Sequence, residues 1–395
     1  MRELDGSFCE DGLPELDPVV AYEITGYGWR GLTSQGEVYE VKGTNGHKAE
    51  VPSEIIVSHA GKPIGRRVVR NEVAVNIDDY LMHFNRVVEL YRENQIEQAL
   101  AESGLALQIF PTLRSKFNRA MVLLAAGRWD EGLAEYLECE QHSPFMRPQV
   151  REALALGMKP WRGENLRGKK LLLLHAHGFG DTIQMLRYVP SFRTVGARAV
   201  VRLPPELQRL ANQPFSEGAD YFCPILHLLH FLHVKPQNVD GRPYLAVDAK
   251  LVESWRERIQ SPRRKVGVAW SIGKPSKGDY PREIPLWELV EALGDVEIHS
   301  VQTQNADEAR ELGVNVHQFE DFADCAAMMM CMDEIVSVDT AALHLAGAIG
   351  HPRVFGLLSH WSSWRWIAPW YADMRLCRQA KADDWSSALA LMNDR

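Results

Sequence analysis

Two short stretches of the sequence carry residues whose types and spacing could do chemistry. In the first, HGFGDTIQ, Gly178 and Gly180 immediately precede Asp181, between an apolar run and an amphipathic stretch. That order predicts a strand, a sharp turn that admits a ligand closely, and a helix. A dinucleotide-binding loop needs a third glycine and has no acid where the pyrophosphate lies, so this turn has another use. Asp181 either points into a ligand cleft or caps the helix.

The second stretch, EIVSVDTAALHLAGAIG, runs from an apolar strand into Asp339, Thr340 and Ala341 at the start of a helix. The unpaired backbone N–H groups and the dipole of a helix N-terminus favour an anion. The hydroxyl of Thr340 adds a donor, and His344 lies in the first turns, where it can reach the same anion. The alternative for His344 is an interior histidine whose hydrogen bonds are satisfied by the core.

The elements that must position these residues are strands and helices in alternation. From Trp161 onward, apolar runs typical of buried strands alternate with amphipathic helical stretches, and the pattern restarts near 260–265. Such alternation predicts two doubly wound parallel sheets. We expect one Rossmann-like α/β domain over 161–262 and a second over 263–395, which ends in a C-terminal helix.

The region before these domains has a different pattern of apolar and polar residues. Residues 18–73 alternate apolar and polar side chains between Gly and Asn-Gly turns, which predicts a small β-rich module over 1–78. The module is either a docking or oligomerisation piece or a structural appendage.

An internal repeat follows the β-rich region. The segment 84–111 aligns without gaps on 117–144, and both copies share a Phe-Asn-Arg start and a closing Pro. Gly127 and Trp129 stand where a tetratricopeptide repeat has its packing residues, so 79–160 resembles a short all-α array of such units. Two copies fall short of a free-standing array. They serve as a packing or spacer element, or as a groove for a protein partner.

Length and composition limit the classes of protein. The chain has 395 residues, of which 46% are hydrophobic and 24% charged, as in soluble globular proteins of several domains. A net charge of −8 and a pI near 6.0 disfavour nucleic acid and anionic membranes as general partners. The acidic start is unlike a secretory signal, and no apolar run reaches the length of a transmembrane segment. Six scattered cysteines predict reduced thiols in a cytoplasm.

Five stretches, taken in order, resemble a known family. They are GFGDTIQMLRYVP, VGVAWSIG, PREIPLWEL, DFADCAAMMMCMDEIVSVDTAALHLAGAIG and WRWIAPWYADMRLCRQ. Together they are similar to the catalytic region of the tetratricopeptide-containing glycosyltransferases related to the lipopolysaccharide heptosyltransferases of glycosyltransferase family 9. The resemblance covers residues 165–395, and SVDTAALHLAGAIG is its most specific part.

The resemblance implies a GT-B fold, in which the first Rossmann-like domain holds the acceptor and the second holds a nucleotide-diphosphate sugar. It also implies transfer with inversion, without an essential metal or other cofactor. Asp181 then matches the base that takes the proton of the acceptor hydroxyl. Thr340, Ala341 and His344 match the helix start that binds the diphosphate, with Asp339 as its orienting acid.

The resemblance leaves open which residue supplies the positive charge that holds a departing diphosphate. Lys274, Lys277 and Arg282 all lie in the loop where related enzymes place a Lys or Arg, and Arg282 best matches the family pattern. Gln302 stands where the family approaches the nucleoside, and its alternative is a surface amide.

Two further clusters have a functional and a structural interpretation. The aromatic run HWSSWRWIAPW, residues 360–370, is a platform for a sugar or base, a stack around Arg365, or packing of the C-terminal segment. Ser363 stands where the relatives have Asp. The histidines in HLLHFLH lack the cysteine or carboxylate partners of a zinc site.

The sequence therefore predicts a cytoplasmic, metal-independent glycosyltransferase that uses a nucleotide sugar. Its acceptor is a glycan, a lipid-linked saccharide or a protein, and a homo-oligomer is compatible with the sequence. Two alternatives stay open: a non-catalytic scaffold that recruits a partner through the helical repeats, and a nucleotide-sugar epimerase on the same fold.

Overall fold

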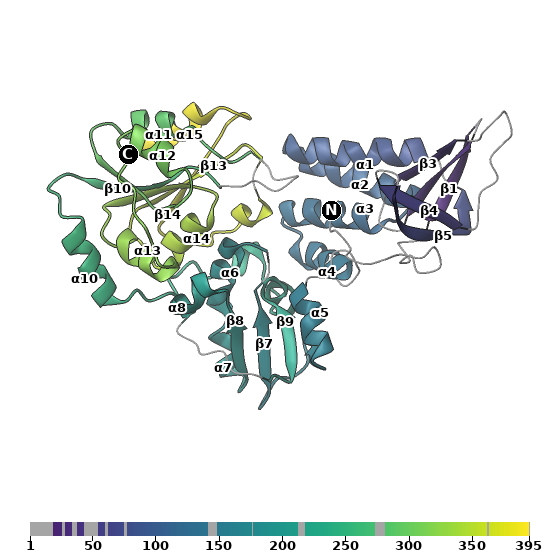
Figure 1. The fold of residues 1–395 in the computed structure, drawn as a ribbon, viewed down its shortest axis with the longest axis horizontal. Helices are drawn as coiled ribbons and strands as arrows, with labels where there is room; N and C mark the ends of the chain where they lie inside the picture. Colours follow the sequence, from purple (N-terminus) through teal and green to yellow (C-terminus); the bar gives the residue numbers. More distant parts are fainter. Residues whose placement is uncertain are drawn as a thin grey trace. The chain divides into compact units, whose positions relative to one another are not determined.

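The computed structural model describes most of the chain after residue 76 and, before it, the backbone of five strands (Figure 1). The described ranges are 19–25, 28–33, 38–42, 54–59, 62–74, 77–140, 148–175, 177–211, 218–272, 281–361 and 363–394. The chain forms two compact units, which we describe separately. The first comprises the residues up to 126 together with 134–139, and the second comprises 127–133 and 140–395.

The first unit begins with a five-stranded sheet of order β3-β2-β1-β5-β4. The strands are β1 (Val19–Thr25), β2 (Gly28–Thr33), β3 (Val38–Lys42), β4 (Glu54–His59) and β5 (Lys62–Ala74). The role of this module, as a docking or oligomerisation piece or as a structural appendage, stays a prediction, because its side chains lie outside the described residues.

Helices joined by short turns follow the sheet. They are α1 (Ile77–Arg92), α2 (Ile96–Ile109), α3 (Leu113–Ala125) and α4 (Trp129–Glu140), the last shared between the two units. Val87 and Leu90 of α1 are buried in one cluster with Ala99 of α2 and Val122 of α3. Each helix thus depends on its neighbours to cover its apolar face. Membership of the tetratricopeptide family stays a prediction.

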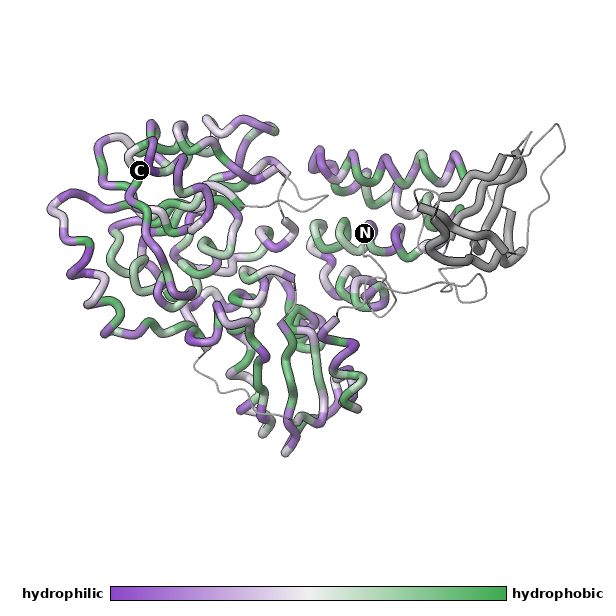
Figure 2. The backbone as a smooth tube through the Cα atoms, in the orientation of Figure 1, coloured by the Kyte–Doolittle hydropathy of each residue, from purple (hydrophilic) through white to green (hydrophobic). Residues whose placement is uncertain are grey.

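The second unit holds two parallel sheets, as the alternation of strands and helices predicts. The smaller sheet, which defines the N-lobe, has the order β6-β9-β7-β8, with parallel pairs throughout. Its strands are β6 (Lys159–Pro160), β7 (Lys170–Leu174), β8 (Arg198–Arg202) and β9 (Tyr221–Pro224). Strand β7 is an apolar run (Figure 2), and its Leu172 and Leu174 pack with Phe222 of β9 and with Ala153 of α5 (Pro148–Ala155).

The larger sheet, which defines the C-lobe, has the order β11-β10-β12-β13-β14 and is also parallel. Its strands are β10 (Lys265–Ala269), β11 (Glu297–Ser300), β12 (Glu334–Val338), β13 (Val354–Leu358) and β14 (Met374–Arg378). Every residue of β12 and β13 is buried. That burial accounts for their apolar runs, because in such a sheet helices cover both faces.

The helices of the C-lobe are α10 (Ala249–Arg258), α11 (Leu286–Leu293), α12 (Ala306–Glu311), α13 (Phe322–Met329), α14 (Ala341–Ala348) and α15 (Trp385–Asn393). The sequence patterns do not predict α12 or β14. Helix α12 has 6 residues, too few to show a helical period, and β14 exposes Arg375 and Leu376 rather than forming a buried apolar run.

The helix expected after the Gly178–Asp181 turn is interrupted in the structure. Helix α6 (Phe179–Met185) continues as the 3-10 turn η2 (Leu186–Tyr188), and α7 (Ser191–Thr194) begins after Pro190. Proline has no amide hydrogen and its ring clashes with the preceding turn, so it divides the helix. The other short helices of this region are η3 (Pro205–Leu207), α8 (Gln208–Ala211), η4 (Ile225–His227), α9 (Leu228–Phe231) and η5 (Pro236–Asn238). Among the helices that the structure describes, none has the length and apolar character needed to cross a membrane.

Candidate functional site

Helix α6 of the N-lobe packs directly against helix α14 of the C-lobe (Figure 1). Gly180 permits this contact, because a Cβ atom there would lie 2.8 Å from Cδ2 of His344 and 3.4 Å from Cα of Ala341. Any larger residue would push the helices apart. The two stretches singled out in the sequence therefore meet, and the atoms that approach the Gly180 backbone belong to α14.

Asp181 connects its own helix start to the opposite lobe. Asp181 is the third residue of α6. The N-cap position, for which Asp181 was a candidate, is occupied by Gly178. Its Oδ2 accepts the Gly178 N–H at 3.2 Å, and its Oδ1 lies 2.6 Å from Nη2 of Arg365. Burial alone would raise the pKa of Asp181, but Arg365, His177 and the Gly178 N–H together hold that pKa below its ordinary value. Asp181 is therefore ionised at neutral pH.

Arg365 is the site residue whose role the sequence analysis missed. It lies on the 3-10 turn η6 (Trp364–Ile367), where its guanidinium stacks over the Trp364 ring at 4.7 Å. Nη1 donates to Oγ of Ser363 at 3.1 Å, while the buried Nε has no hydrogen-bond partner in the part of the chain that the structure describes. In the sequence, the tryptophans close to Arg365 indicate that its guanidinium stacks on a ring. They do not indicate that it pairs with Asp181.

His344 lies in the first turns of α14 and is only 5% exposed. Its ring stacks on Trp366 at a centroid distance of 4.8 Å, and its Nδ1 lies 3.0 Å from the Tyr371 hydroxyl. Burial lowers the pKa of His344 to about 4, against the opposing influence of Asp339 and Asp181. The imidazole is therefore neutral at pH 7 and can offer an anion a hydrogen bond but no charge.

The start of α14 keeps its hydrogen-bonding capacity. Thr340 occupies the N-cap position, but its own side chain does not cap the helix, because its hydroxyl is instead 3.1 Å from Oγ of Ser337. The first backbone N–H groups of α14 can thus bind an external acceptor.

Asp339 is buried just before the first N–H groups of α14, with Nη1 of Arg282 3.9 Å from its Oδ2. Of the three loop cations considered, Arg282 is the one placed here, and Lys274 and Lys277 lie outside the described residues.

Gln302 is buried rather than a surface amide. Its Oε1 accepts the backbone N–H groups of Trp270 and Ser271 at 2.9 and 3.1 Å, and its Nε2 donates to Oγ of Ser271 at 2.9 Å. These hydrogen bonds join both polar atoms of the Gln302 side chain to other groups of the protein. They hold the end of β10, where the loop toward Arg282 begins.

A buried cluster beside the glycine turn was also missed. Glu140, at the end of α4, has Oε2 2.6 Å from Nε2 of His227 and Oε1 3.4 Å from Nε2 of His177. Burial would raise the pKa of Glu140, but its bonds to the two histidines hold that pKa far below its ordinary value. His177 has φ of 63° and directly precedes Gly178, so this cluster fixes the backbone where the turn begins. No local pattern signals Glu140, because its partners are distant in the sequence.

The start of α4 supports the segment that carries Arg365. Trp129 packs edge-on against Trp364, with centroids 5.2 Å apart, and stacks on Trp370 at 5.7 Å. These two tryptophans lie on either side of Arg365 in the sequence. The aromatic run therefore packs the C-terminal segment and at the same time positions a cation.

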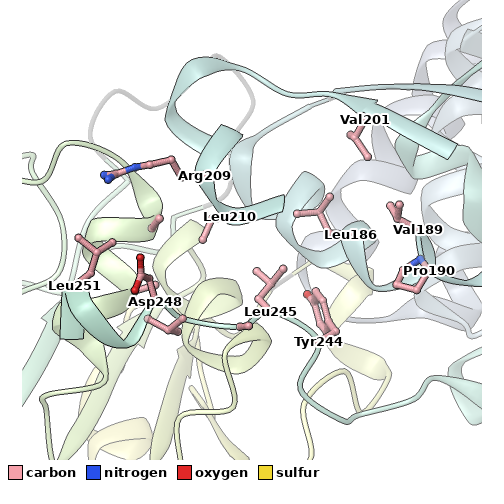
Figure 3. Close-up of a pocket in the computed structure, with 14 residues that line it drawn as sticks. Leu186, Val189, Pro190, Val201, Arg209, Leu210, Tyr244, Leu245, Asp248 and Leu251 are labelled. Carbon is pink, nitrogen blue, oxygen red and sulfur yellow. The ribbon is translucent and has the colours of Figure 1, made fainter. Parts of the chain in front are cut away.

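An apolar cavity of about 650 Å³ lies elsewhere in the second unit (Figure 3). Leu186, Leu210 and Leu245 surround its middle, and Arg209 and Asp248 lie toward one end. None of the residues expected in the functional site lines this cavity. Across the described residues, no group of three or more histidine, cysteine or carboxylate side chains is arranged to hold a metal ion.

Comparisons with known proteins find similarity to a curated protein and to solved structures. No model of a known protein family matches the chain. Protein FlbA of Caulobacter vibrioides is 26% identical over 346 residues, which is 74% of this chain and 57% of that protein. The chain thus spans little more than half the length of this curated relative.

Two of the similar solved structures are a glycosyl transferase of family 9 from Veillonella parvula and the ADP-heptose lipopolysaccharide heptosyltransferase II of Escherichia coli. The first has a TM-score of 0.41 and 9% identity, over 55% of this chain and 87% of that one. The second has a TM-score of 0.42 and 11% identity, over 57% of this chain and 97% of that one.

Proposed function

We propose that this chain is an inverting glycosyltransferase of the GT-B type. It moves a sugar from a nucleotide-diphosphate donor to an acceptor hydroxyl. One observation carries the proposal: an ionised carboxylate of one lobe, Asp181, lies beside an uncapped helix start of the other lobe, at Thr340. A displacement reaction at a sugar needs both a base that takes the acceptor proton and a site that stabilises the negative charge of the leaving group.

Asp181 would act as the base. Its lowered pKa keeps the carboxylate deprotonated at neutral pH, so it is ready to take the proton of an acceptor hydroxyl. The Gly178 N–H fixes one carboxylate oxygen, which limits the rotation of the group. The same bond anchors Asp181 to the rigid start of α6 rather than to a free loop.

The start of α14 would hold the diphosphate. The backbone N–H groups of Ala341 and its neighbour and the Thr340 hydroxyl supply neutral donors along the axis of the helix dipole. Arg282, close to the buried Asp339, is the loop cation best placed to add charge. His344 would add a hydrogen bond, because it is neutral.

The test is the isosteric variant Asp181→Asn in the full chain. The variant should bind nucleotides while losing transfer by roughly 100- to 10,000-fold, the usual contribution of a general base. Nucleotide binding is measured by thermal shift against a panel of nucleoside diphosphates and nucleotide sugars. Full transfer activity in the variant would rule out Asp181 as the base.

The same panel separates the other candidate functions. A non-catalytic scaffold would show no shift with any nucleotide, and an epimerase would interconvert nucleotide sugars without an acceptor. The proposal also includes a nucleotide sugar as the donor and a glycan, a lipid-linked saccharide or a protein as the acceptor. It further includes a cytoplasmic location, a homo-oligomer and a protein partner on the helical repeats. A structure with the best nucleotide would test the assignment of Ala341, Gln302 and Arg282 directly.

A further inference from the structure

Arg365 and Arg209 both link the two lobes to an aspartate, but their surroundings differ. Arg209 of α8 pairs through Nε and Nη2 with Asp321, the N-cap residue of α13, and the Arg209 side chain is 42% exposed. Arg365 pairs with Asp181 through Nη2 alone, and its side chain is 17% exposed. The first pair resembles an ordinary surface bridge, which stabilises little. The second pair is only partly exposed and includes the expected base.

The guanidinium of Arg365 has hydrogen-bonding capacity left over. Nη2 faces Asp181, Nη1 donates to Ser363, and the planar group rests on Trp364. The Nε–H is buried and has no hydrogen-bond partner among the described residues. A buried N–H of a charged group normally has an acceptor, so this one indicates a further oxygen in the functional state.

Arg365 is also adjacent to the start of α14. The next residue, Trp366, stacks on His344, and Gly180, just before Asp181, touches Ala341. The positive charge of Arg365 contributes to the lowered pKa of His344, which places the guanidinium within electrostatic reach of this helix start. An anion at Thr340 and Ala341 would therefore lie beside Arg365.

We propose that Arg365 is a catalytic residue that shifts its ion pair from Asp181 to the departing diphosphate during sugar transfer. This inference rests on the proposed function. It assigns Arg365 as a cation of the leaving-group site, in addition to any loop cation. The ligand is the diphosphate of a nucleotide sugar.

The charges balance in this step. The acceptor O–H bond breaks and its proton goes to Asp181, while the acceptor oxygen forms a bond to the anomeric carbon. The bond from that carbon to the phosphate oxygen breaks, and its electron pair stays on the phosphate. Asp181 thus loses one negative charge as the nucleoside diphosphate gains one. Arg365, placed between them, keeps one negative partner throughout with little rearrangement.

The experiment measures the affinity of nucleoside diphosphates alone, so it needs neither the acceptor nor the sugar. Isothermal titration calorimetry on the full chain would use ADP, GDP, UDP and CDP at pH 7.5. Asp181→Asn should bind the best of these about tenfold tighter than the natural chain, because Arg365 is released for the phosphate. Arg365→Met should bind it about tenfold more weakly, and Arg365→Lys should fall between.

The double variant separates a direct role from a structural one. Adding Asp181→Asn to Arg365→Met should give no tightening over Arg365→Met alone. Arg209→Met is the matched control, because it removes the other bridge between the lobes and should leave the affinity within about twofold. An equal loss in the Arg209 variant would mean that the lobe contact, and not the Arg365 charge, sets the affinity.

The outcomes distinguish this inference from the proposed function. If no nucleoside diphosphate binds the natural chain, the proposed function fails and the inference fails with it. If one binds and Asp181→Asn leaves its affinity unchanged, the role of Arg365 is refuted while the transferase proposal stands. If Arg365→Met does not fold, Asp181→Asn and Arg365→Lys still decide the question.

Discussion

The two helix starts that meet between the lobes differ in how they use their polar groups. The start of α6 is closed on itself: the carboxylate of Asp181 accepts the Gly178 N–H and pairs with Arg365. The start of α14 is open in the sense that its N-cap side chain does not cap it, because the Thr340 hydroxyl turns toward Ser337. One start holds a charge in place, and the other offers neutral donors.

This difference explains why two similar strand-to-helix turns serve different chemistry. The acid at the third position of α6, Asp181, accepts the N-cap N–H and places a negative charge at that helix start. Its carboxylate is therefore held in place and can take a proton. The start of α14 carries no acid within the helix and can receive an anion from outside. The structure thus separates the proton-accepting side from the anion-binding side, and Arg365 lies close to both.

The largest expected effect that tests this difference concerns the charge of His344. The pKa of this histidine falls from 6.5 in the unfolded chain to about 4 in the fold, chiefly because of burial. The unfolded state therefore binds more protons, so the stabilisation is complete above about pH 6.5 and is lost as the pH falls toward 4. At about 1.4 kcal/mol per pKa unit, the loss is roughly 2–3 kcal/mol by pH 4.5.

The variant His344→Phe keeps a ring against Trp366 and removes the titration. Chemical denaturation at pH 7.5, 5.5 and 4.5 should show that the free energy of unfolding falls more steeply with acid in the natural chain than in the variant. Parallel curves would mean that His344 titrates in the fold as it does in the unfolded chain. The start of α14 would then hold a cation below about pH 6.5, rather than neutral donors alone.

A smaller effect is expected from Gly180, which allows the two helix starts to meet. Gly180→Ala would place a methyl group 2.8 Å from Cδ2 of His344, and the resulting overpacking should lower the free energy of unfolding by about 1–3 kcal/mol. Gly178→Ala is the matched control, because its Cβ would meet only Oδ2 of Asp181 at 3.8 Å. Its backbone is extended, with φ of −93°, so the control should cost less than about 0.5 kcal/mol. Equal costs would show that α6 and α14 are not in close contact.

The sequence predicted those parts of the fold that follow from local patterns. The two parallel sheets were confirmed, because β7, β12 and β13 are apolar runs that helices cover. The break after η2 and the edge strand β14 were not predicted. In the first case Pro190 overrides a helical period, and in the second an exposed edge strand needs no apolar run.

The site shows the same limit. Asp181, Thr340 and His344 could be singled out because each lies in a strand-to-helix turn with its own signal. The pairing of Asp181 with Arg365 could not, because it depends on how the two lobes pack. The same holds for Gln302, whose side-chain oxygen accepts the N–H of Trp270, directly after the neighbouring strand β10. Side-chain pairs across the fold have no local pattern in the sequence.

The smallest effect concerns the open start of α14. Thr340→Val removes one hydroxyl donor and keeps the shape of the side chain, so donor binding should weaken by about 1 kcal/mol. That loss corresponds to a KM for the nucleotide sugar raised roughly fivefold, with kcat less affected. Ser337→Ala is the matched control, because it breaks the same 3.1 Å contact and leaves the Thr340 hydroxyl free to bind the anion. If the control raises KM as much as Thr340→Val does, Thr340 acts by fixing the turn rather than by binding the diphosphate, and α14 is less open than its missing cap implies.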